Sequence, residues 1–558
     1  MSGRLKLLYP FMFAVLPILH ILNRSPGGAS LPDSGVVLTA AVLACAIVYA
    51  LVTLALGRRR QPAVPVIVLA LILWFYGSDG LATRTHRFGP AAVPAVLLIA
   101  ALITAVVIWW LVRRPAHLDR LATFLTLTGL LLLVSSGVIL ARNQLRSRSA
   151  LRHSGLVREL ARPVPKKSPG TAGAAQRDVY LIVLDEYANA GVLREQFGFD
   201  NHVFEDSLRQ LGFTIPRSVR SNYVHTLLSL PSILNFSHMT RLTRELGPLA
   251  TDPTVPNYLV EHNRTAAFLR SLGYAFLFFP SQWWVSTEHN READWEFQPW
   301  TGFSLAREAT RSDLRRSLVR STALDLLRRD HAYDAEHVRR TLAAVTQVPR
   351  VAGPTFVFAH IINPHRPYVF DADCRTAKTG AGGSDAGGRK RGYVEQVQCL
   401  NRQLLGVVTT LLERSSPPPI ILLQGDHGTN ILEYSKARTA SEVSPEQAYE
   451  RFGAFGAYYL PKGGSSRLTG SVTTVNLLQE VLDYYFDAAV PRSRDALYMS
   501  LERTPYDFTE IDPASLTPRP GTRSALGPRI SCDSASGLAS WSCASSSKPA
   551  CAWISRRG

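Results

Sequence analysis

DVYLIVLDE (178–186) is an unbroken apolar run, rich in β-branched residues, that ends in two acidic side chains. A run of this kind is typical of a strand that is buried on both faces of a parallel sheet. Similar runs recur at YAFLFFP (274–280), TFVFAHI (355–361) and PIILLQG (419–425), with a weaker one at GAYYLP (456–461). The first run therefore marks the start of a soluble domain that we expect to span residues 178–512.

Helix-like sequence lies between these predicted strands, at residues 203–212, 263–273, 334–348 and 394–414. Strands that alternate with helices predict an α/β fold with a largely parallel sheet. In such a sheet, ligands bind beyond the carboxyl ends of the strands. Polar residues at those ends therefore become candidates for a functional site.

Carboxylate and imidazole side chains lie at the ends of three predicted strands: Asp185, Glu186, His360, Asp426 and His427. Oxygen and nitrogen donors that converge around an open position suit a Zn²⁺- or Mn²⁺-like ion. An Asp-His pair after a strand is also common as a turn or a helix cap, so either motif alone is weak. Two strand ends of this kind in one domain favour a metal site.

The segment SNYVHTLLSLPSILN (221–235) holds a candidate nucleophile. Thr226 precedes helix-like sequence, and Pro231, which has no N–H, fits best in a first helical turn that Ser229 caps. A hydroxyl at a helix N-terminus faces free N–H groups and the positive end of the helix dipole, which stabilise a phosphoryl or sulfuryl group. A metal ion on the same oxygen would make it an attacking alkoxide. The alternative is that Thr226 and Ser229 act only as caps.

The first quarter of the chain has a different composition. Residues 1–142 contain 12 Lys and Arg, three Asp and no Glu, within a chain of net charge +18. Apolar stretches in this part are each near the ~20 residues that a helix needs to cross a bilayer. They lie at residues 7–23, 35–57, 63–77, 93–112 and 121–141. We therefore predict a transmembrane region of five helices over residues 1–142.

Basic residues between the predicted spans indicate the orientation of the chain in the membrane. Eight of them lie on the side of the N-terminus, and only Arg24, Arg84 and Arg87 lie on the other side. We expect the first side to be cytoplasmic, at an inner or plasma membrane of bacterial type, with everything after residue 142 outside the cytoplasm. Part of the positive charge is then a topology signal and gives no support to nucleic-acid binding.

The segment 143–177 connects the membrane part to the soluble part. Its first half is basic with interspersed leucines, which predicts a helix that lies on anionic headgroups, with membrane lipids as partners. A solvated linker helix is an equal alternative. The second half, PVPKKSPGTAGAAQ (163–176), is typical of a flexible spacer.

Cysteines and the C-terminal segment give two further expectations. Cys374 and Cys399 flank a Gly-rich basic loop, and outside the cytoplasm a disulfide between them is permitted, with free thiols as the alternative. Residues 513–558 are rich in Ser, Pro and Gly and have no apolar periodicity. We expect this tail to be disordered.

Four pieces of sequence together resemble the alkaline phosphatase and sulfatase superfamily. They are LIVLDE (181–186), TLLSLPS (226–232), HIINPH (360–365) and GDHG (425–428). Among its members they are most similar to the membrane-anchored phosphoethanolamine transferases and lipoteichoic acid synthases. The resemblance implies an alkaline-phosphatase-like α/β domain over roughly 178–465, and it covers the N-terminal quarter only through the five-span topology.

The resemblance also implies roles for single residues. The implied metal ligands are Glu186, Thr226, Asp426 and His427, with Asp185 ranked below Glu186. Catalytic roles are implied for Thr226 as the nucleophile, and for His360 and His365 in binding the transferred anion or protonating a leaving group. The cofactor would be one divalent cation, Zn²⁺ or Mn²⁺, with Ca²⁺ or Mg²⁺ as alternatives. A core position for His360 is an equal alternative.

Two features depart from the pattern of these families. Residues 428–461 contain no His, although the transferases carry a further His soon after the motif at 425–428. The stretch from Ser229 to Ser232 is similar to the start of the hydrolytic sulfatase motif, but Ile233 stands where that motif has Arg. The absence of a nearby Cys disfavours formylglycine chemistry.

The sequence therefore predicts a membrane-anchored metalloenzyme that transfers or hydrolyses phospho- or sulfo-esters through a covalent intermediate on Thr226. Its partners would be an ester donor and an acceptor in the cell envelope. The alternative is a catalytically degenerate scaffold or sensor of the same fold. A transporter has little support, because the spans lack the buried charges of a coupled carrier. The donor, the acceptor, the choice between phosphate and sulfate, and the oligomeric state stay open.

Overall fold

The structure is a computed structural model of the 558-residue chain. It describes residues 8–24, 31–86, 92–113, 115–167, 176–281, 285–299, 312–324, 332–378, 383, 385–434, 436–468 and 470–516. Most of the tail that we expect to be disordered lies outside these residues, as do residues 379–382 and 384 of the Gly-rich loop between Cys374 and Cys399.

The N-terminal part consists of long apolar helices, whose bounds are α1 Tyr9–Arg24, α2 Leu31–Leu56, α3 Val64–His86, α4 Ala92–Val112 and α5 Pro115–His153, with the 3-10 helix η2 at Arg58–Ala63. Within the described residues, four stretches are long and apolar enough to cross a membrane: Pro32–Leu56, Gln61–Ser78, Ala92–Trp110 and His117–His153. The chain therefore has a membrane region and a soluble domain. The remaining predicted span coincides with α1, of which 16 residues are described, so the count of five stays a prediction.

The basic segment after residue 142 does not form a separate helix on the membrane surface. It continues α5 to His153, and Ser154 then caps the short helix α6, Gly155–Leu160. Leu156 and Leu160 are buried in a cluster of the soluble domain. These two leucines pack against the soluble domain, whereas the apolar pattern of this segment predicted a helix on lipid headgroups or a solvated linker helix.

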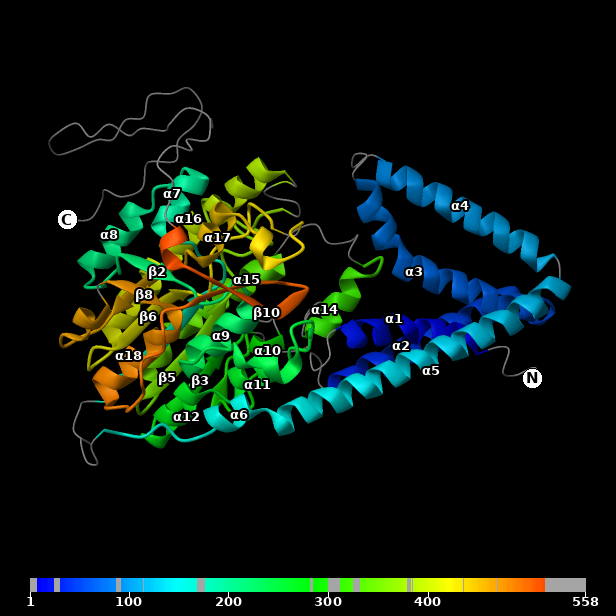
Figure 1. Ribbon diagram of the computed structural model, residues 1–558. Coiled ribbons are helices and arrows are strands. Elements are labelled where there is room, and N and C mark those ends of the chain that lie inside the picture. Colours follow the sequence, from blue (N-terminus) through cyan, green and yellow to red (C-terminus); the bar gives the residue numbers. More distant parts are fainter. Residues whose placement is uncertain are drawn as a thin grey trace, which may run out of the picture. The chain divides into compact units, whose positions relative to one another are not determined.

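The core of the soluble domain is a six-stranded sheet in the order β4-β3-β5-β1-β6-β7 (Figure 1). Its strands are β1 Val179–Leu184, β3 Ala275–Phe279, β4 Trp295–Glu296, β5 Thr355–Ile361, β6 Ile420–Gly425 and β7 Gly456–Tyr459. All neighbours pair in parallel except β6 and β7. The predicted α/β fold with a largely parallel sheet is confirmed, and each predicted apolar run is a strand.

Helices cover both faces of this sheet, because alternate side chains of each strand enter two separate clusters. On β1, Tyr180 and Ile182 belong to one cluster, whereas Leu181 and Val183 belong to the other. Helices with residues in the first cluster are α7 Ala190–Phe197, α8 His202–Gln210, α15 Ala332–Val345 and α16 Ala386–Arg414. Helices in the second are α9 Thr226–Asn235, α11 Thr254–Glu261, α12 Arg264–Ser271 and α18 Thr474–Phe486. The result is a three-layer arrangement (Figure 1).

Shorter elements complete the domain. Two further pairs of strands form, β2 Ser218–Arg220 with β8 Ser471–Thr473, and β9 Leu497–Leu501 with β10 Thr504–Ile511. The remaining helices are α10 Arg241–Leu246, α14 Asp313–Arg320 and α17 Pro445–Phe452, with 3-10 turns at Val285–Thr287, Val348–Arg350, Ala440–Glu442, Gly464–Leu468 and Pro513–Leu516. A disulfide joins Cys374 to Cys399, as the sequence predicts.

Candidate metal centre

The central strands bring the predicted site residues to one edge of the sheet. In the parallel register of β1 with its two neighbours, Leu184 lies opposite both Ile361 and Gly425. The residues that follow β1 and β6 therefore meet next to the end of β5. This is the edge at which ligands bind in parallel sheets.

Three side chains at this edge form a group that could hold a metal ion: Asp185, His360 and Asp426. One ligand atom from each lies within 4.8 Å of the others, and all three residues are buried. The Nε2 atom of His360 is 3.8 Å from Oδ2 of Asp185. The sequence predicts two of these three as ligands, and it predicts His360 as a contact of the transferred anion.

The two carboxylates of this group are electrostatically incompatible without a cation. Burial, followed by the charge of Asp185, raises the pKa of Asp426 well above its usual range. Oδ1 of Asp426 accepts hydrogen bonds from the backbone N–H groups of Glu186 (3.1 Å) and His427 (2.9 Å). Its Oδ2 has no hydrogen-bond partner among the described residues. A positive ion between the carboxylates would stabilise both, because burying like charges together is costly.

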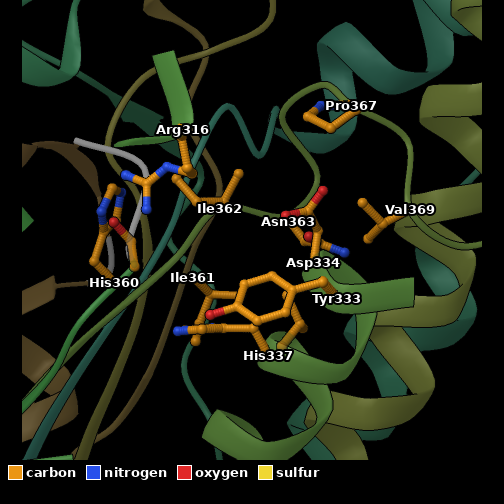
Figure 2. Close-up of a pocket in the computed structure, with 12 residues that line it drawn as sticks. Arg316, Tyr333, Asp334, His337, His360, Ile361, Ile362, Asn363, Pro367 and Val369 are labelled. Carbon is orange, nitrogen blue, oxygen red and sulfur yellow. The ribbon is translucent and has the colours of Figure 1, made fainter. Parts of the chain in front are cut away.

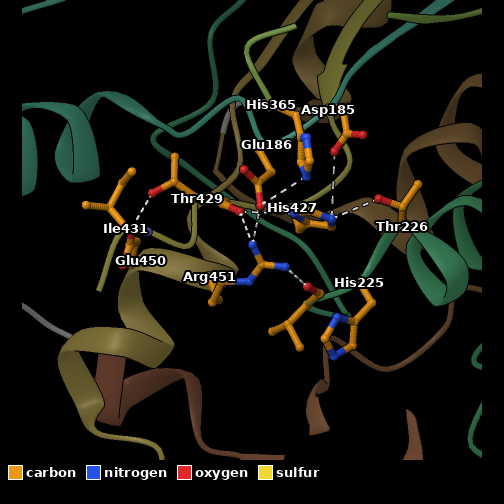
Figure 3. Close-up of polar contacts among 12 residues, drawn as sticks. Asp185, Glu186, His225, Thr226, His365, His427, Thr429, Ile431, Glu450 and Arg451 are labelled. Atoms are coloured by element: carbon orange, nitrogen blue, oxygen red, sulfur yellow. Dashed lines mark hydrogen bonds and ion pairs between the residues drawn. The ribbon is translucent and has the colours of Figure 1, made fainter. Parts of the chain in front are cut away.

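His427 presents a lone pair to the same place. Its Nδ1 lies 3.0 Å from the carbonyl oxygen of Gly428, which can only accept, so Nδ1 carries the hydrogen and Nε2 is free to act as an acceptor or a ligand. Nε2 faces Oγ1 of Thr226 at 3.0 Å (Figure 3) and lies 3.2 Å from Oδ2 of Asp426. Burial and the nearby Arg451 lower the pKa of His427 well below its usual range, which keeps the imidazole neutral.

His360 is oriented in a similar way by neighbours outside the group. Its Nδ1 is 3.0 Å from Oγ1 of Thr287, which is 2.6 Å from Oγ of Ser281. Burial, and secondarily His365, lower the pKa of His360 to about 3. A neutral imidazole with its Nε2 directed at carboxylates is the form in which histidine binds metals.

Thr226 begins helix α9, with His225 as the N-cap residue. The hydroxyl of Thr226 is buried beside His427 at the helix N-terminus, as the sequence predicts for a nucleophile. The predicted cap is wrong, because the N-cap is His225, four residues before Ser229. Ser229 lies within the helix and donates to the carbonyl of Tyr223 at 3.1 Å.

The carboxylate of Glu186 pairs with Arg451 and is not part of the metal-ligand group. Its Oε1 accepts a hydrogen bond from Nη1 of Arg451 at 2.8 Å, and the backbone of Glu186 adopts φ 61°, an uncommon conformation for a residue with a side chain (Figure 3). Asp185, which the sequence motif ranks below Glu186 as a ligand, is the acid at this strand end that lies within the group of possible donors.

Arg451 is a site residue that sequence reasoning misses. It lies on α17, is 3% exposed, and donates to the backbone carbonyls of Val224 and Gly428 as well as to Glu186. The one signal for it is a charged pair, Glu450 and Arg451, directly before the buried strand at 456–459. It connects the loop that carries His427 to the segment before Thr226.

His365 lies at the open side of the centre. Its side chain is 23% exposed, and Nε2 is 3.9 Å from Oε1 of Glu186. Its backbone N–H donates to the carbonyl of Asp185 at 3.1 Å. A partly exposed imidazole at the rim is placed to meet a ligand that enters from solvent.

The donor set fits a divalent cation. Carboxylate oxygens and imidazole nitrogens are ligands of Zn²⁺ and Mn²⁺, and the candidate donors are Asp185, His360, Asp426 and His427, with the hydroxyl of Thr226 adjacent. Glu186 is left out of this set. The position between these donors is therefore the candidate metal centre.

Comparisons with known proteins give only distant similarities. No family model matches the chain, and no curated protein matches its sequence. The C-terminal periplasmic domain of EcEptC from Escherichia coli, solved in complex with Zn, is 11% identical, covers 62% of this chain and 96% of its own, and has a TM-score of 0.44. The integral membrane lipooligosaccharide phosphoethanolamine transferase A from Neisseria meningitidis is 13% identical, covers 88% and 96%, and has a TM-score of 0.41.

A third similar structure is the putative sulfatase yidJ from Bacteroides fragilis, which is 12% identical, covers 60% of this chain and 83% of its own, and has a TM-score of 0.36. These solved structures are of the same kinds of protein that the sequence motifs resemble. Each TM-score lies below 0.5, so the proposals that follow rest on the geometry of the centre.

Proposed function

We propose that the chain is a membrane-anchored, metal-dependent enzyme that transfers or hydrolyses phospho- or sulfo-ester groups of envelope lipids or glycans through a covalent ester on Thr226. One observation carries this proposal. The buried hydroxyl of Thr226, at the N-terminus of α9, lies 3.0 Å from Nε2 of His427, beside the group formed by Asp185, His360 and Asp426.

The first half of the reaction would form the ester. A bound divalent cation would supply positive charge that lowers the pKa of the Thr226 hydroxyl and stabilises the charge of the transferred group. Thr226 Oγ1 would release its proton to water and form a bond to phosphorus or sulfur, and the bond to the leaving oxygen would break with its electron pair going to that oxygen. The N–H groups at the start of α9 stabilise the anion, and His365 at the rim would contact it or protonate the leaving oxygen.

The second half would release the group. The hydroxyl of an acceptor, or water, attacks the ester, and the oxygen of Thr226 leaves. Transfer and hydrolysis differ only in which of these two reaches the ester. The membrane region favours a lipid or another envelope component as a partner, with the soluble domain outside the cytoplasm at a plasma membrane of bacterial type.

A direct test uses the full chain in detergent, loaded with Zn²⁺ or Mn²⁺ and incubated with p-nitrophenyl phosphate or p-nitrophenyl sulfate. We expect mass spectrometry to find the added phosphate or sulfate on the peptide that contains Thr226. The adduct should be absent in Thr226→Ala and present in Thr226→Ser. Turnover by the Thr226→Ala variant at the rate of the parent would contradict the covalent mechanism.

The second candidate is a non-catalytic scaffold or sensor of the same fold, which the absence of His from residues 428–461 favours. The two candidates are separated by metal content and turnover. Bound metal that is lost in Asp426→Ala, without turnover of either ester, would support the scaffold. Bound metal together with the Thr226 adduct would support the enzyme.

A further inference from the structure

A cavity lies beside the metal-ligand group, at the carboxyl end of β5. His360 and residues 361–363 form one wall, side chains of α15 form another, and Arg316 of α14 closes it (Figure 2). His360 thus belongs both to the ligand group and to the cavity wall. A substrate whose ester group is held at Thr226 could place its adjoining part in this cavity.

Two buried polar side chains of the cavity wall lack a hydrogen-bond partner at one atom, within the part of the chain that the structure describes. They are Asn363, 1% exposed, at Nδ2 and His337, 6% exposed, at Nε2. Leaving a buried donor or acceptor unpaired is costly, and a ligand atom that pairs with it removes this cost. The amide Nδ2 of Asn363 can only donate, so this wall is suited to a ligand with acceptor oxygens. Asp334 and Tyr333 add a carboxylate and a phenol to the lining.

Arg316 adds a guanidinium to the same cavity from a different part of the chain. It is 6% exposed and lies on α14, next to Arg315. Its planar set of five donors suits an oxygen-rich group. The guanidinium of Arg316 and the amide of Asn363 thus line the same cavity from two different parts of the chain.

Helix α14 is held by the membrane helices. Leu314 is buried in a cluster with Ile18, Leu19 and Leu22 of α1 and with Val37 of α2. A further contact is the backbone N–H of Ala323, which donates to the carbonyl of Phe75 in α3 at 2.7 Å. The helix that closes the cavity therefore packs on the membrane region.

A polar contact fixes the same helix. Nε and Nη2 of Arg315 are each 2.7 Å from Oδ1 of Asp33, at the start of α2, and Oγ of Ser312 donates to Oδ2 of Asp33. The two charged side chains are only 15% and 16% exposed. Both nitrogens of Arg315 contact the same oxygen of Asp33, and removing one partner of a largely buried pair is more destabilising than breaking a surface pair.

We propose that this cavity is a substrate subsite for an oxygen-rich polar group next to the transferred ester, that Arg316 contacts this group, and that Asp33 positions Arg316 through Arg315. The proposal rests on the proposed function for the metal centre. Its consequence is that the membrane region is part of the substrate-binding geometry as well as an anchor.

The test measures binding and not turnover. Isothermal titration uses the full chain in detergent with Zn²⁺ bound and Thr226→Ala as the common parent. The ligands are methyl phosphate, glycerol 3-phosphate and a dihexanoyl lipid with the same glycerol phosphate group, and the matching sulfate esters are titrated in parallel. We expect glycerol 3-phosphate to bind at least five-fold more tightly than methyl phosphate, and a further gain for the lipid would identify a lipid source.

Substitution of Arg316 should remove the gain that the polar group provides. We expect Arg316→Gln to abolish the five-fold difference while changing the affinity for methyl phosphate less than two-fold, and Arg316→Lys to keep part of it. The exposed Arg414→Gln serves as the matched control and should change neither affinity. Zinc content and thermal unfolding equal to those of the parent would show that each variant is folded.

A double-mutant cycle tests the positioning role of Asp33. We expect Asp33→Asn to lose about three-fold in affinity for glycerol 3-phosphate, and to lose nothing further when Arg316→Gln is already present. Exchange of the charges, Asp33→Arg with Arg315→Asp, should restore the affinity of the parent. If Arg316→Gln kept the full difference in affinity between glycerol 3-phosphate and methyl phosphate, the subsite would be overturned. If Asp33→Asn lowered the affinity for glycerol 3-phosphate by the same factor with and without Arg316→Gln, the positioning role would be overturned.

The outcomes for this inference and for the proposed function can be told apart. Binding that depends on Arg316, in a chain that never forms an ester on Thr226, would uphold the subsite and contradict the enzyme. An ester on Thr226, together with binding that is independent of Arg316, would uphold the enzyme and contradict the subsite. The failure of the parent to bind any of these esters would contradict both.

Discussion

At the scale of single residues, the structure gives two neighbouring acids different surroundings. Asp185 lies with His360 and Asp426 in the group that could hold a metal ion, whereas Glu186 pairs with the buried Arg451. Both are carboxylates at the end of the same strand, and only the direction of the side chain distinguishes them. Substitutions at the two positions should therefore have different effects on metal binding.

Asp185→Asn should lower metal affinity at least ten-fold, because it removes an anionic ligand from a group that contains two carboxylates. Glu186→Gln should keep the metal, because its side chain lies outside the group. The measurement is metal content by mass spectrometry after dialysis against a graded series of chelator concentrations. Metal loss in Glu186→Gln with full retention in Asp185→Asn would restore the ranking that the sequence motif implied.

Arg451→Gln should destabilise the chain by roughly 3–5 kcal/mol, because it leaves the carboxylate of Glu186 buried without its cation. Denaturation of the soluble domain in the full chain, followed by tryptophan fluorescence, measures the free energy of unfolding. The control Arg414→Gln, at an exposed position of α16, should stay within about 0.5 kcal/mol. An effect of Arg451→Gln as small as that of the control would show that the pair contributes little.

His337 should make stability depend on pH. Burial, with a smaller effect of Arg316, lowers its pKa to about 4, against an ordinary 6.5. A depressed folded pKa means that the unfolded chain takes up this proton first, so stability is complete above pH 6.5 and is lost as the pH falls toward 4. The loss at pH 4 is about 3 kcal/mol from this group.

The measurement for His337 is the difference in unfolding free energy between the parent and His337→Gln across pH 7 to 4. We expect the advantage of the parent to shrink over this range, because Gln does not titrate. A constant difference between the two proteins would contradict a neutral, buried His337.

At the scale of elements, short segments tie distant parts of the domain together. The disulfide from Cys374 to Cys399 joins the segment after β5 to helix α16, with a sequence separation of 25. Helix α14 contacts both the membrane helices and the cavity at β5. The hydrophobic periodicity of the sequence does not reveal such contacts. Each contact involves a few residues, in a segment whose apolar residues show little regular spacing.

Replacement of Cys374 and Cys399 by Ala should lower the free energy of unfolding by about 3 kcal/mol, because the unfolded chain regains the freedom of a loop of that length. Denaturant unfolding of the double variant, compared with the oxidised parent, measures the loss. The same variant should keep its metal, because neither cysteine belongs to the ligand group. Equal stability of the two proteins would show that the disulfide contributes little.

At the scale of the whole molecule, the membrane region sets the side on which the soluble domain lies. Between residues 58–60 and the soluble domain, the chain passes through three helices that could cross a membrane. An odd number of crossings would place these two parts on opposite sides, whether or not α1 crosses as well. From the basic residues at 58–60 we therefore predict that the soluble domain lies outside the cytoplasm.

Reporter fusions test this topology. A reporter that is active only outside the cytoplasm should be inactive when it is joined after residue 60 and active when it is joined after residue 516. A fluorescent reporter that folds only in the cytoplasm should give the opposite pattern. Activity of the same reporter at both positions would contradict the predicted orientation.

The sequence by itself determined the sheet and the edge at which the site lies. Unbroken apolar runs are typical of strands buried on both faces, and the polar ends of parallel strands meet at one edge, so Asp426 and His427 could be chosen from this pattern. Thr226 could be chosen from its place before helix-like sequence. Only the tertiary structure brought Asp185 and His360 together with Asp426 and paired Glu186 with the buried Arg451. These arrangements depend on the direction of side chains and on contacts between segments hundreds of residues apart. The local periodicity of a sequence carries no information on either.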